Sequence, residues 1–560
     1  MFDGLPLPAE SMDQLYVGPA IGEIDGWNLA SVFEEFRRIL RQDGLIRIAA
    51  WDLDAALAAR ERGDRSFFWE QDCTIERAFE AQILGYGSAR SLFNAARVTE
   101  HLQQAGFTSI TERSPHQTDD PTGRLAEPDS LGDYCCFVEA RNPSGWPLAS
   151  DRQDPSGVHL TLADRHGRRL NVVWSAPART EWSLRCRPES TTEWVDYPVR
   201  SWPTSDGPNG NHVFSGRTPE LESGRRYDYE IVQAGPDPQP VSGSFAAPPQ
   251  PGSATVRLAF LADTGLVGRD DGLSDGTLAV LGEVTRLEPD LILGGGDYAY
   301  RSSDDRRLTP QQAVNSWLDQ MSPVLSRIPF VAQYGNHEVE LGERYRDWST
   351  HFPEIDPVID DSPPSVSCRS YSIDIGPCHV VAFYAPTAAI DPAEVSWLWN
   401  DLAAARSAGA RWVIVFQHQP LVAHGRSHPA EKSVDHALAQ VLEANGVDLH
   451  LSAHDQNYER TYPVRWRDGA PEAMTTEQSI YRRGQGTVLA KISPAGKRSD
   501  RGKDFSKLPD RLDPVVAAAS DSGHHFGCIT ASGNELVIEA RRLGRGGSQT
   551  ETIDRVVIRR

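Results

Sequence analysis

The chain has 560 residues, which exceeds a single hydrophobic core, so we expect about three domains of roughly 100 to 200 residues each. Hydrophobic residues make up 39% and charged residues 24%, which excludes a disordered chain. The net charge of −22 argues against a broad surface for nucleic acid or an anionic membrane. The N-terminus lacks a signal-peptide pattern and no stretch predicts a membrane span, so we expect a cytoplasmic protein.

Residues 1–145 predict an α/β unit, because helical and strand patterns alternate. An amphipathic helix is expected to end at Gly44, and a buried strand follows over residues 45–54. A second amphipathic helix ends at Gly106, and residues 135–140 close the unit as a strand.

This order of elements, with the sequences RILRQDGLIRIAAWDLD, HLQQAGF and FVEARNP, resembles the C-terminal half of a class I S-adenosylmethionine-dependent methyltransferase over about residues 5–143. The resemblance implies a truncated Rossmann-like unit. The glycine-rich turn and the acidic residue that hold the cofactor belong to the half that this chain lacks. S-adenosylmethionine is therefore not an expected cofactor, and the unit is expected to dock a protein partner or to act as a scaffold.

Residues 155–248 change to the alternating pattern of β-strands. The apolar positions that share strand faces are Val158, Leu160 and Leu162, then Leu170, Val172 and Trp174, then Tyr227, Tyr229 and Ile231. Glycine and proline turns separate these strands, which predicts a small β-sandwich of fibronectin type III-like form. The segment AAPPQPGS is typical of a short stiff linker to the third region, residues 254–560.

In the third region, five apolar runs of strand length each end in Asp, Asn or His: VRLAFLADTG, PDLILGGGDYAY, IPFVAQYGNHEVE, RWVIVFQHQP and VDLHLSAHDQNYER. Ligands bind outside the carboxyl ends of strands in open α/β sheets, so we expect these polar side chains to converge. Taken singly, each has an ordinary structural explanation. Asp263 could cap a turn, Asn336 could adopt a left-handed conformation, and His418 could be a hydrogen-bonded core histidine.

Together the five segments resemble, in order, the motif set of the purple acid phosphatases within the calcineurin-like metallophosphoesterases. The motifs are D-x-G at 263–265, G-D-x-x-Y at 296–300, G-N-H-E at 335–338, V-x-x-H at 415–418 and, in place of G-H-x-H, A-H-D-Q at 453–456. The preceding β-sandwich and the trailing YERTYPV also match that family. The resemblance therefore covers about residues 155–560 and implies a four-layer α/β/β/α catalytic domain.

The resemblance also implies two metal ions, iron together with iron, zinc or manganese. Asp297 would bridge them. Asp263 and Tyr300 would complete the first site, and Asn336, His418 and His454 would hold the second. Such a pair clamps phosphate oxygens and acidifies a bound water, so that hydroxide attacks phosphorus in line with the leaving group.

Three histidines are candidates for contact with the substrate. His337 matches the family residue that contacts the phosphate and assists the leaving group. His428 lies where the family places a histidine near the metals, which makes it a candidate general acid, and His424 is its rival. An ordinary surface histidine is almost as strongly expected at either position.

Gln456 stands where the family has a histidine ligand of the first metal. A glutamine carbonyl oxygen is a weaker donor than imidazole for late transition metals, although it suits Mn²⁺ or Fe²⁺. We therefore expect a weakened first site.

The leading hypothesis is a dinuclear-metal phosphoesterase that hydrolyses a phosphomonoester, or a phosphodiester, of a small molecule or glycan. Two alternatives stay open: a non-catalytic binding or assembly protein with a degenerate metal site, and an enzyme that uses the altered site for different chemistry. The sequence does not determine the substrate, the metals or the oligomeric state.

Overall fold

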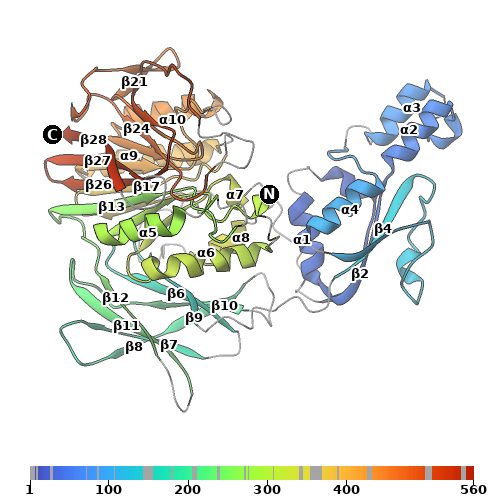
Figure 1. The fold of residues 1–560 in the computed structure, drawn as a ribbon, viewed down its shortest axis with the longest axis horizontal. Helices are drawn as coiled ribbons and strands as arrows, with labels where there is room; N and C mark the ends of the chain where they lie inside the picture. The colour runs from blue at the N-terminus through green and yellow to red at the C-terminus, as the bar shows by residue number, and fades with distance from the viewer. Residues whose placement is uncertain are drawn as a thin grey trace. The chain divides into compact units, whose positions relative to one another are not determined.

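The structure is a computed structural model of the chain. It describes residues 7, 11–24, 29–70, 72–84, 88–105, 107–142, 155–177, 181–204, 211–235, 240–269, 273–274, 276–304, 306, 308–339, 345–352, 369–387, 390–425, 430, 432–498, 507–543 and 550–560. The first of two compact units comprises Met1–Arg152 with the segments Pro203–Asn211 and Glu340–Arg346, and the second comprises the remainder (Figure 1). Over these described ranges, no helix is both long enough and apolar enough to cross a membrane.

The first unit contains a four-stranded sheet in the order β1-β2-β4-β3, in which β1 and β2 are parallel and β4 is antiparallel to both of its neighbours. The strands are β1 (Met12–Val17), β2 (Leu40–Trp51), β3 (Thr108–Arg113) and β4 (Cys135–Arg141). The helices are α1 (Leu29–Ile39), α2 (Leu53–Arg62), α3 (Ile75–Ile83) and α4 (Ala95–Gln104). Apolar side chains of α1 and α4 pack with those of β2 and β4 in one core.

Helix α1 ends at Ile39, earlier than the predicted end at Gly44. The side-chain nitrogen Nδ2 of Asn142 donates to the carbonyl oxygens of Leu40 and Arg41, at 2.9 and 3.2 Å. These bonds satisfy carbonyl groups that a longer helix would have paired internally. Leu40 then begins β2. The prediction missed this end because the residue that stabilises it lies far away in the sequence.

A β-sandwich begins the second unit. One sheet has the order β5-β6-β10-β9 and the other β12-β11-β7-β8. The strands are β5 (Ser156–Leu162), β6 (Leu170–Pro177), β7 (Trp182–Pro188), β8 (Val195–Tyr197), β9 (Val199–Pro203), β10 (Asn211–Arg217), β11 (Arg226–Gln233) and β12 (Val241–Ala246). Alternate residues of both sheets, including Trp174, Leu184 and Tyr229, are buried in a shared core.

Two seven-stranded sheets form the centre of the remaining chain, in the orders β15-β14-β13-β26-β27-β28-β23 and β16-β17-β18-β19-β24-β20-β25. The strands of the first are β13 (Thr255–Leu261), β14 (Leu291–Gly295), β15 (Phe330–Gln333), β23 (Ile480–Arg482), β26 (His524–Ser532), β27 (Glu535–Leu543) and β28 (Thr550–Arg559). Those of the second are β16 (Tyr371–Ile375), β17 (Cys378–Ala382), β18 (Trp412–Phe416), β19 (Leu449–Ser452), β20 (Tyr458–Thr461), β24 (Val488–Ile492) and β25 (Val516–Ser520). A separate hairpin joins β21 (Val464–Arg467) to β22 (Ala470–Ala473).

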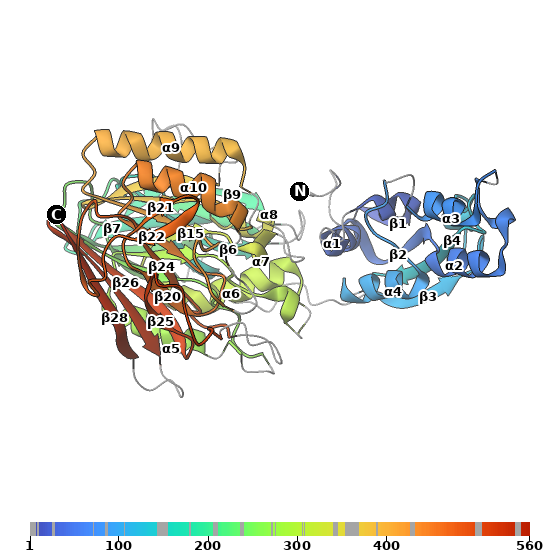
Figure 2. The same ribbon diagram turned by 90° about the horizontal axis from the view of Figure 1, so that it is seen from above.

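Helices cover the outer faces of the two sheets, giving four layers. Helix α5 (Gly276–Leu287) contacts β26, β27 and α6 (Pro310–Leu325). Helices α9 (Pro392–Ser407) and α10 (Lys432–Ala444) lie side by side and share a core with β17 and β18 (Figure 2). The short helices α7 (Asn336–Val339) and α8 (Tyr345–Ser349) follow β15.

The register of the parallel strands brings the predicted motifs to one edge of each sheet. In the first sheet, Leu261 pairs with Gly294 and Gly295 pairs with Gln333, so β13, β14 and β15 end together. In the second, Phe416 pairs with Leu451. The polar residues that follow these five strands therefore leave the sheets at neighbouring points.

Candidate metal centre

Backbone hydrogen bonds tie the loops of the two sheets together. The Asp263 amide donates to the carbonyl oxygen of Gly296 at 3.0 Å, and the Ala453 amide donates to that of His418 at 3.0 Å. The His454 amide, from the second sheet, donates to Asp263 Oδ2 in the first at 3.2 Å. The strand ends thus converge on one site.

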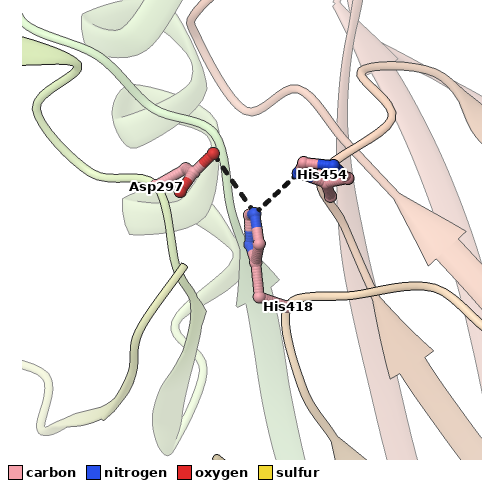
Figure 3. A group of neighbouring side chains, drawn as sticks. All are labelled: Asp297, His418 and His454. Atoms are coloured by element: carbon pink, nitrogen blue, oxygen red, sulfur yellow. Dashed lines mark hydrogen bonds and ion pairs between the residues drawn. The ribbon is translucent and has the colours of Figure 1, made fainter. Parts of the chain in front are cut away.

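Three of the predicted ligands meet at the centre of this site: Asp297, His418 and His454, whose ligand atoms all lie within 4.8 Å of one another (Figure 3). His418 Nε2 lies 3.2 Å from Asp297 Oδ2 and 3.2 Å from His454 Nδ1. The other ring nitrogen of His418 donates to the carbonyl oxygen of Gly295 at 2.8 Å, which directs Nε2 into the site. A carboxylate and two imidazoles are ligands that Zn²⁺, Fe²⁺ and Mn²⁺ accept.

Two buried amide oxygens, Asn336 Oδ1 and Gln456 Oε1, have no hydrogen-bond partner within the described part of the chain. An unsatisfied buried acceptor costs about 1 to 3 kcal/mol, and a bound cation would offset that cost. Asn336 belongs to this site, since the next amide, of His337, donates to Asp297 Oδ1 at 2.9 Å. These two oxygens therefore fit the role of further ligands near Asp297, His418 and His454.

A second group of side chains is joined by hydrogen bonds: the Tyr300 hydroxyl donates to Asp263 Oδ1, and Gln456 Nε2 donates to the Tyr300 oxygen at 3.0 Å. All three side chains are buried. Gln456 thus lies beside Tyr300 and Asp263, the two residues predicted to complete the first metal site.

Four of the nine non-glycine residues with positive φ in the described ranges are predicted ligands: Asp263 (55°), Asp297 (55°), Tyr300 (57°) and His454 (70°). This left-handed conformation costs roughly 1 to 2 kcal/mol per residue and is concentrated at functional sites. The loops therefore store strain where they present the ligands.

Gly335 and Glu338 hold the loop that carries Asp297. A Cβ atom on Gly335 would lie 2.1 Å from Asp297 Oδ1, so only glycine fits there. The Glu338 carboxylate accepts from the amides of Asp297 and Tyr298, at 2.7 and 2.8 Å, and from that of Gly335 at 2.8 Å. Glu338 is the last residue of the G-N-H-E motif, and this role of Glu338 was not predicted from the sequence.

The titratable groups of the site shift one another's pKa values. Burial raises the pKa of Asp263 to about 6, and the nearby Asp297 carboxylate adds to this effect. Burial alone would also raise the pKa of Asp297, but the imidazoles of His418, His337 and His454 together lower that pKa below its ordinary value. Burial opposes charge on His418, yet Asp297 and Asp263 raise its pKa to about 9. The carboxylates thus favour a positive charge in this pocket.

The predicted substrate-contacting histidines differ in what the structure shows of them. His337 Nδ1 lies 3.1 Å from Ser302 Oγ, and its ring centroid is 4.2 Å from that of Tyr300. His424 Nδ1 lies 2.5 Å from Glu459 Oε2. His428 falls outside the described residues.

Sequence reasoning missed a buried cluster behind the ligand loop, in which the Lys491 ammonium donates to Asp455 and Glu459. A signal was available, because Lys491 interrupts the apolar run VLAKI of a strand with no exposed position. A charged residue in such a strand requires a buried partner.

The calcineurin-like phosphoesterase family matches residues 256–458. Purple acid phosphatase 22 of Arabidopsis thaliana is 25% identical over 64% of this chain and 76% of its own length. Acid phosphatase type 7 of Homo sapiens is 25% identical over 31% of this chain and 41% of its own. Among solved structures, the purple acid phosphatase PPD1 from yellow lupin (Lupinus luteus) seeds matches with a TM-score of 0.60, at 18% identity, over 72% of this chain and 74% of that one.

Proposed function

We propose that this chain, a purple acid phosphatase-like calcineurin-like metallophosphoesterase, hydrolyses phosphomonoesters with two metal ions held at the convergent strand ends. The observation that supports this proposal most directly is the approach of Asp297, His418 and His454 ligand atoms to within 4.8 Å of one another. The calcineurin-like phosphoesterases and purple acid phosphatases that this chain resembles are metal-dependent phosphoesterases. The substrate and the identity of the metals are part of the proposal.

Two groups of residues would hold the metals. Asp263, Tyr300 and Gln456 would bind one ion, Asn336, His418 and His454 would bind the other, and Asp297 would be shared. Two such ions supply charge stabilisation for phosphate oxygens and a nucleophile that is active at neutral pH.

The remaining side chains would orient the substrate. We infer that His337, beside Tyr300 and the Asp297 loop, contacts the phosphate. One of the two histidines that follow His418, His424 or His428, would give a proton to the leaving oxygen. The same arrangement would serve a phosphodiester, because only the pocket for the second ester group differs.

Metal content and one substitution test the proposal. The purified protein is expected to hold two metal ions per chain by elemental analysis, and Asp297→Ala is expected to abolish hydrolysis of p-nitrophenyl phosphate because both sites lose their shared ligand. Asp196→Asn, on the exposed strand β8, is the matched control and is expected to keep both properties.

The outcomes separate the alternatives. Full metal occupancy without hydrolysis of any phosphoester tested would contradict the proposal and favour different metal chemistry. Absence of metal from the wild-type protein, even after incubation with Mn²⁺ or Zn²⁺, would favour a non-catalytic binding protein.

For the first unit, we propose a docking or scaffolding role without S-adenosylmethionine. The residues that carry the resemblance, about 5–143, match the C-terminal half of a methyltransferase and not its cofactor-binding half. Calorimetric titration of the full chain with S-adenosylmethionine is expected to give no binding heat, and a measurable affinity would overturn this role.

A further inference from the structure

Lys491 lies at the centre of a buried ionic cluster behind the predicted ligand loop. It is on β24, between β19 and β20, and pairs across the sheet with Ser452 on one side and Glu459 on the other. Its ammonium donates to Asp455 Oδ2 and Glu459 Oε1. All three side chains are at most 1% exposed, so no water replaces these contacts.

One side of the cluster holds the ligand loop. Asp455 lies between His454 and Gln456 in the chain, but its carboxylate accepts from Lys491, from the Gly425 amide at 2.9 Å and from Asn457 Nδ2 at 3.1 Å. Its two neighbours in the chain contact predicted metal ligands: His454 contacts His418, and Gln456 contacts Tyr300. Asp455 therefore anchors the loop on the side away from His418 and Tyr300, while His454 and Gln456 would hold the proposed metals.

The other side of the cluster holds His424. Glu459 accepts from the His424 backbone amide at 3.0 Å, and its second oxygen lies 2.5 Å from His424 Nδ1. An ionised carboxylate only accepts hydrogen bonds, so Nδ1 carries the proton and a neutral His424 ring has its lone pair on Nε2. Glu459 is held ionised because Lys491 and His424 offset its burial and lower its pKa to about 2.

We propose that Lys491 is a positioning residue that couples the metal-ligand loop to His424. Through Asp455 it fixes the loop that carries His454 and Gln456, and through Glu459 it fixes the tautomer and position of His424. The inference about His424 chemistry rests on the proposed phosphoesterase function; the inferences about metal affinity and tautomer do not.

The cluster has two arms, which single substitutions separate. Asp455→Asn is expected to lower the affinity for Mn²⁺ by roughly 10- to 100-fold, as supporting contacts of metal ligands commonly do, and to leave the His424 tautomer unchanged. Glu459→Gln is expected to change the His424 tautomer and to leave the affinity for Mn²⁺ unchanged. Lys491→Met is expected to change both, because it leaves two buried carboxylates without their shared cation.

Calorimetric titration with Mn²⁺ alone and ¹⁵N NMR of the histidine rings measure these effects in the full chain. His424→Asn assigns the His424 resonances. Lys507→Met, which removes an exposed lysine that pairs with Asp521 at 3.7 Å, is the matched control and is expected to match the wild type in both. Wild-type Mn²⁺ affinity and an unchanged Nδ1–H tautomer in Lys491→Met would overturn the proposal.

A double-mutant cycle on kcat distinguishes positioning from a general structural role. Because Glu459→Gln affects only His424, Glu459→Gln combined with His424→Asn is expected to be no slower than the slower single variant if Glu459 acts through His424, whereas independent effects would multiply and contradict this route. If Lys491→Met does not fold, Asp455→Asn and Glu459→Gln still test each arm, and an unchanged metal affinity and tautomer in both would refute the coupling. A wild-type protein without phosphoesterase activity would refute the proposed function alone.

Discussion

At the scale of single residues, successive side chains of the segment AHDQNYER contact different parts of the structure. His454 and Gln456 approach the predicted ligands His418 and Tyr300, while Asp455 binds Lys491 on the opposite side. These three residues lie in the bend between β19 and β20, where His454 has the left-handed conformation, so the loop and its hydrogen bonds present them to opposite sides. Gln456 therefore lies beside Tyr300, with its carbonyl oxygen unsatisfied among the described residues.

Gln456→His is expected to tighten the first metal site by roughly tenfold or more, because a neutral imidazole nitrogen is a better donor for late transition metals than an amide oxygen. Titration with Zn²⁺, followed by elemental analysis after dialysis, measures the change. Gln103→His, on the exposed face of α4, controls for adventitious binding by an added histidine. Unchanged stoichiometry and unchanged activity would show that Gln456 is not a ligand position.

At the scale of elements, the site depends on how five strands end. Each ligand loop leaves its strand directly, and three of these loops place a ligand in the left-handed conformation. Glu338 on α7 and Gly335 before it hold the loop after β14, so the end of one strand supports that of its neighbour. Such mutual support explains why the motifs occur as a set.

The strand boundaries were more predictable than the end of helix α1. A buried strand carries its own apolar pattern, and β14, β15, β18 and β19 lie within the predicted segments. The end of α1 depends on Asn142, a contact that no local pattern contains. Elements stabilised by local patterns are predictable, and ends stabilised by distant side chains are not.

At the scale of the whole second unit, the β-sandwich and the domain of the two seven-stranded sheets share one apolar core, which includes Tyr229 from the sandwich and Phe260 from β13. The Tyr229 hydroxyl donates to the carbonyl oxygen of Ser326 at 2.9 Å, and Ser322 Oγ donates to that of Val158 at 2.8 Å. The sandwich is thus continuous with the domain that carries the site.

An ionic cluster adds to this junction. His379 on β17 lies 2.8 Å from Asp374 Oδ1 and 2.8 Å from Asp401 Oδ2, and Arg165 of the sandwich lies 3.1 Å from Asp374. Burial alone would lower the pKa of His379, but the hydrogen bonds to Asp374 and Asp401 raise it to about 9. The protonated ring therefore links the two carboxylates.

This cluster predicts a loss of stability at alkaline pH. The folded-state pKa of about 9 exceeds the unfolded value near 6.5, so the contribution of His379 is complete below pH 6.5 and disappears as the pH rises through about 9. It amounts to at most about 3 kcal/mol. His379→Gln is expected to lower the thermal midpoint of the second unit most at pH 6 and least at pH 9.5, by calorimetry.

His212→Gln, at a half-buried histidine whose pKa is lowered by burial, serves as the control. The difference between its thermal midpoint and that of the wild type is not expected to shrink as the pH rises from 6 to 9.5. A His379→Gln deficit that stays constant from pH 6 to pH 9.5 would contradict the assignment of the charged ring.

The sequence by itself predicted the α/β and β character of the chain and the polar residues at the strand ends, because buried strands and polar strand ends leave local patterns. The expectation of metal-dependent phosphoester chemistry came from the resemblance of the motif set to a known family. Only the tertiary structure decided that Asp297, His418 and His454 meet, that Gln456 lies against Tyr300, and that Lys491 joins Asp455 to Glu459. The most distant of these pairs in the sequence, Asp297 and His454, are 157 positions apart. Long-range packing fixes them, and no local pattern records it.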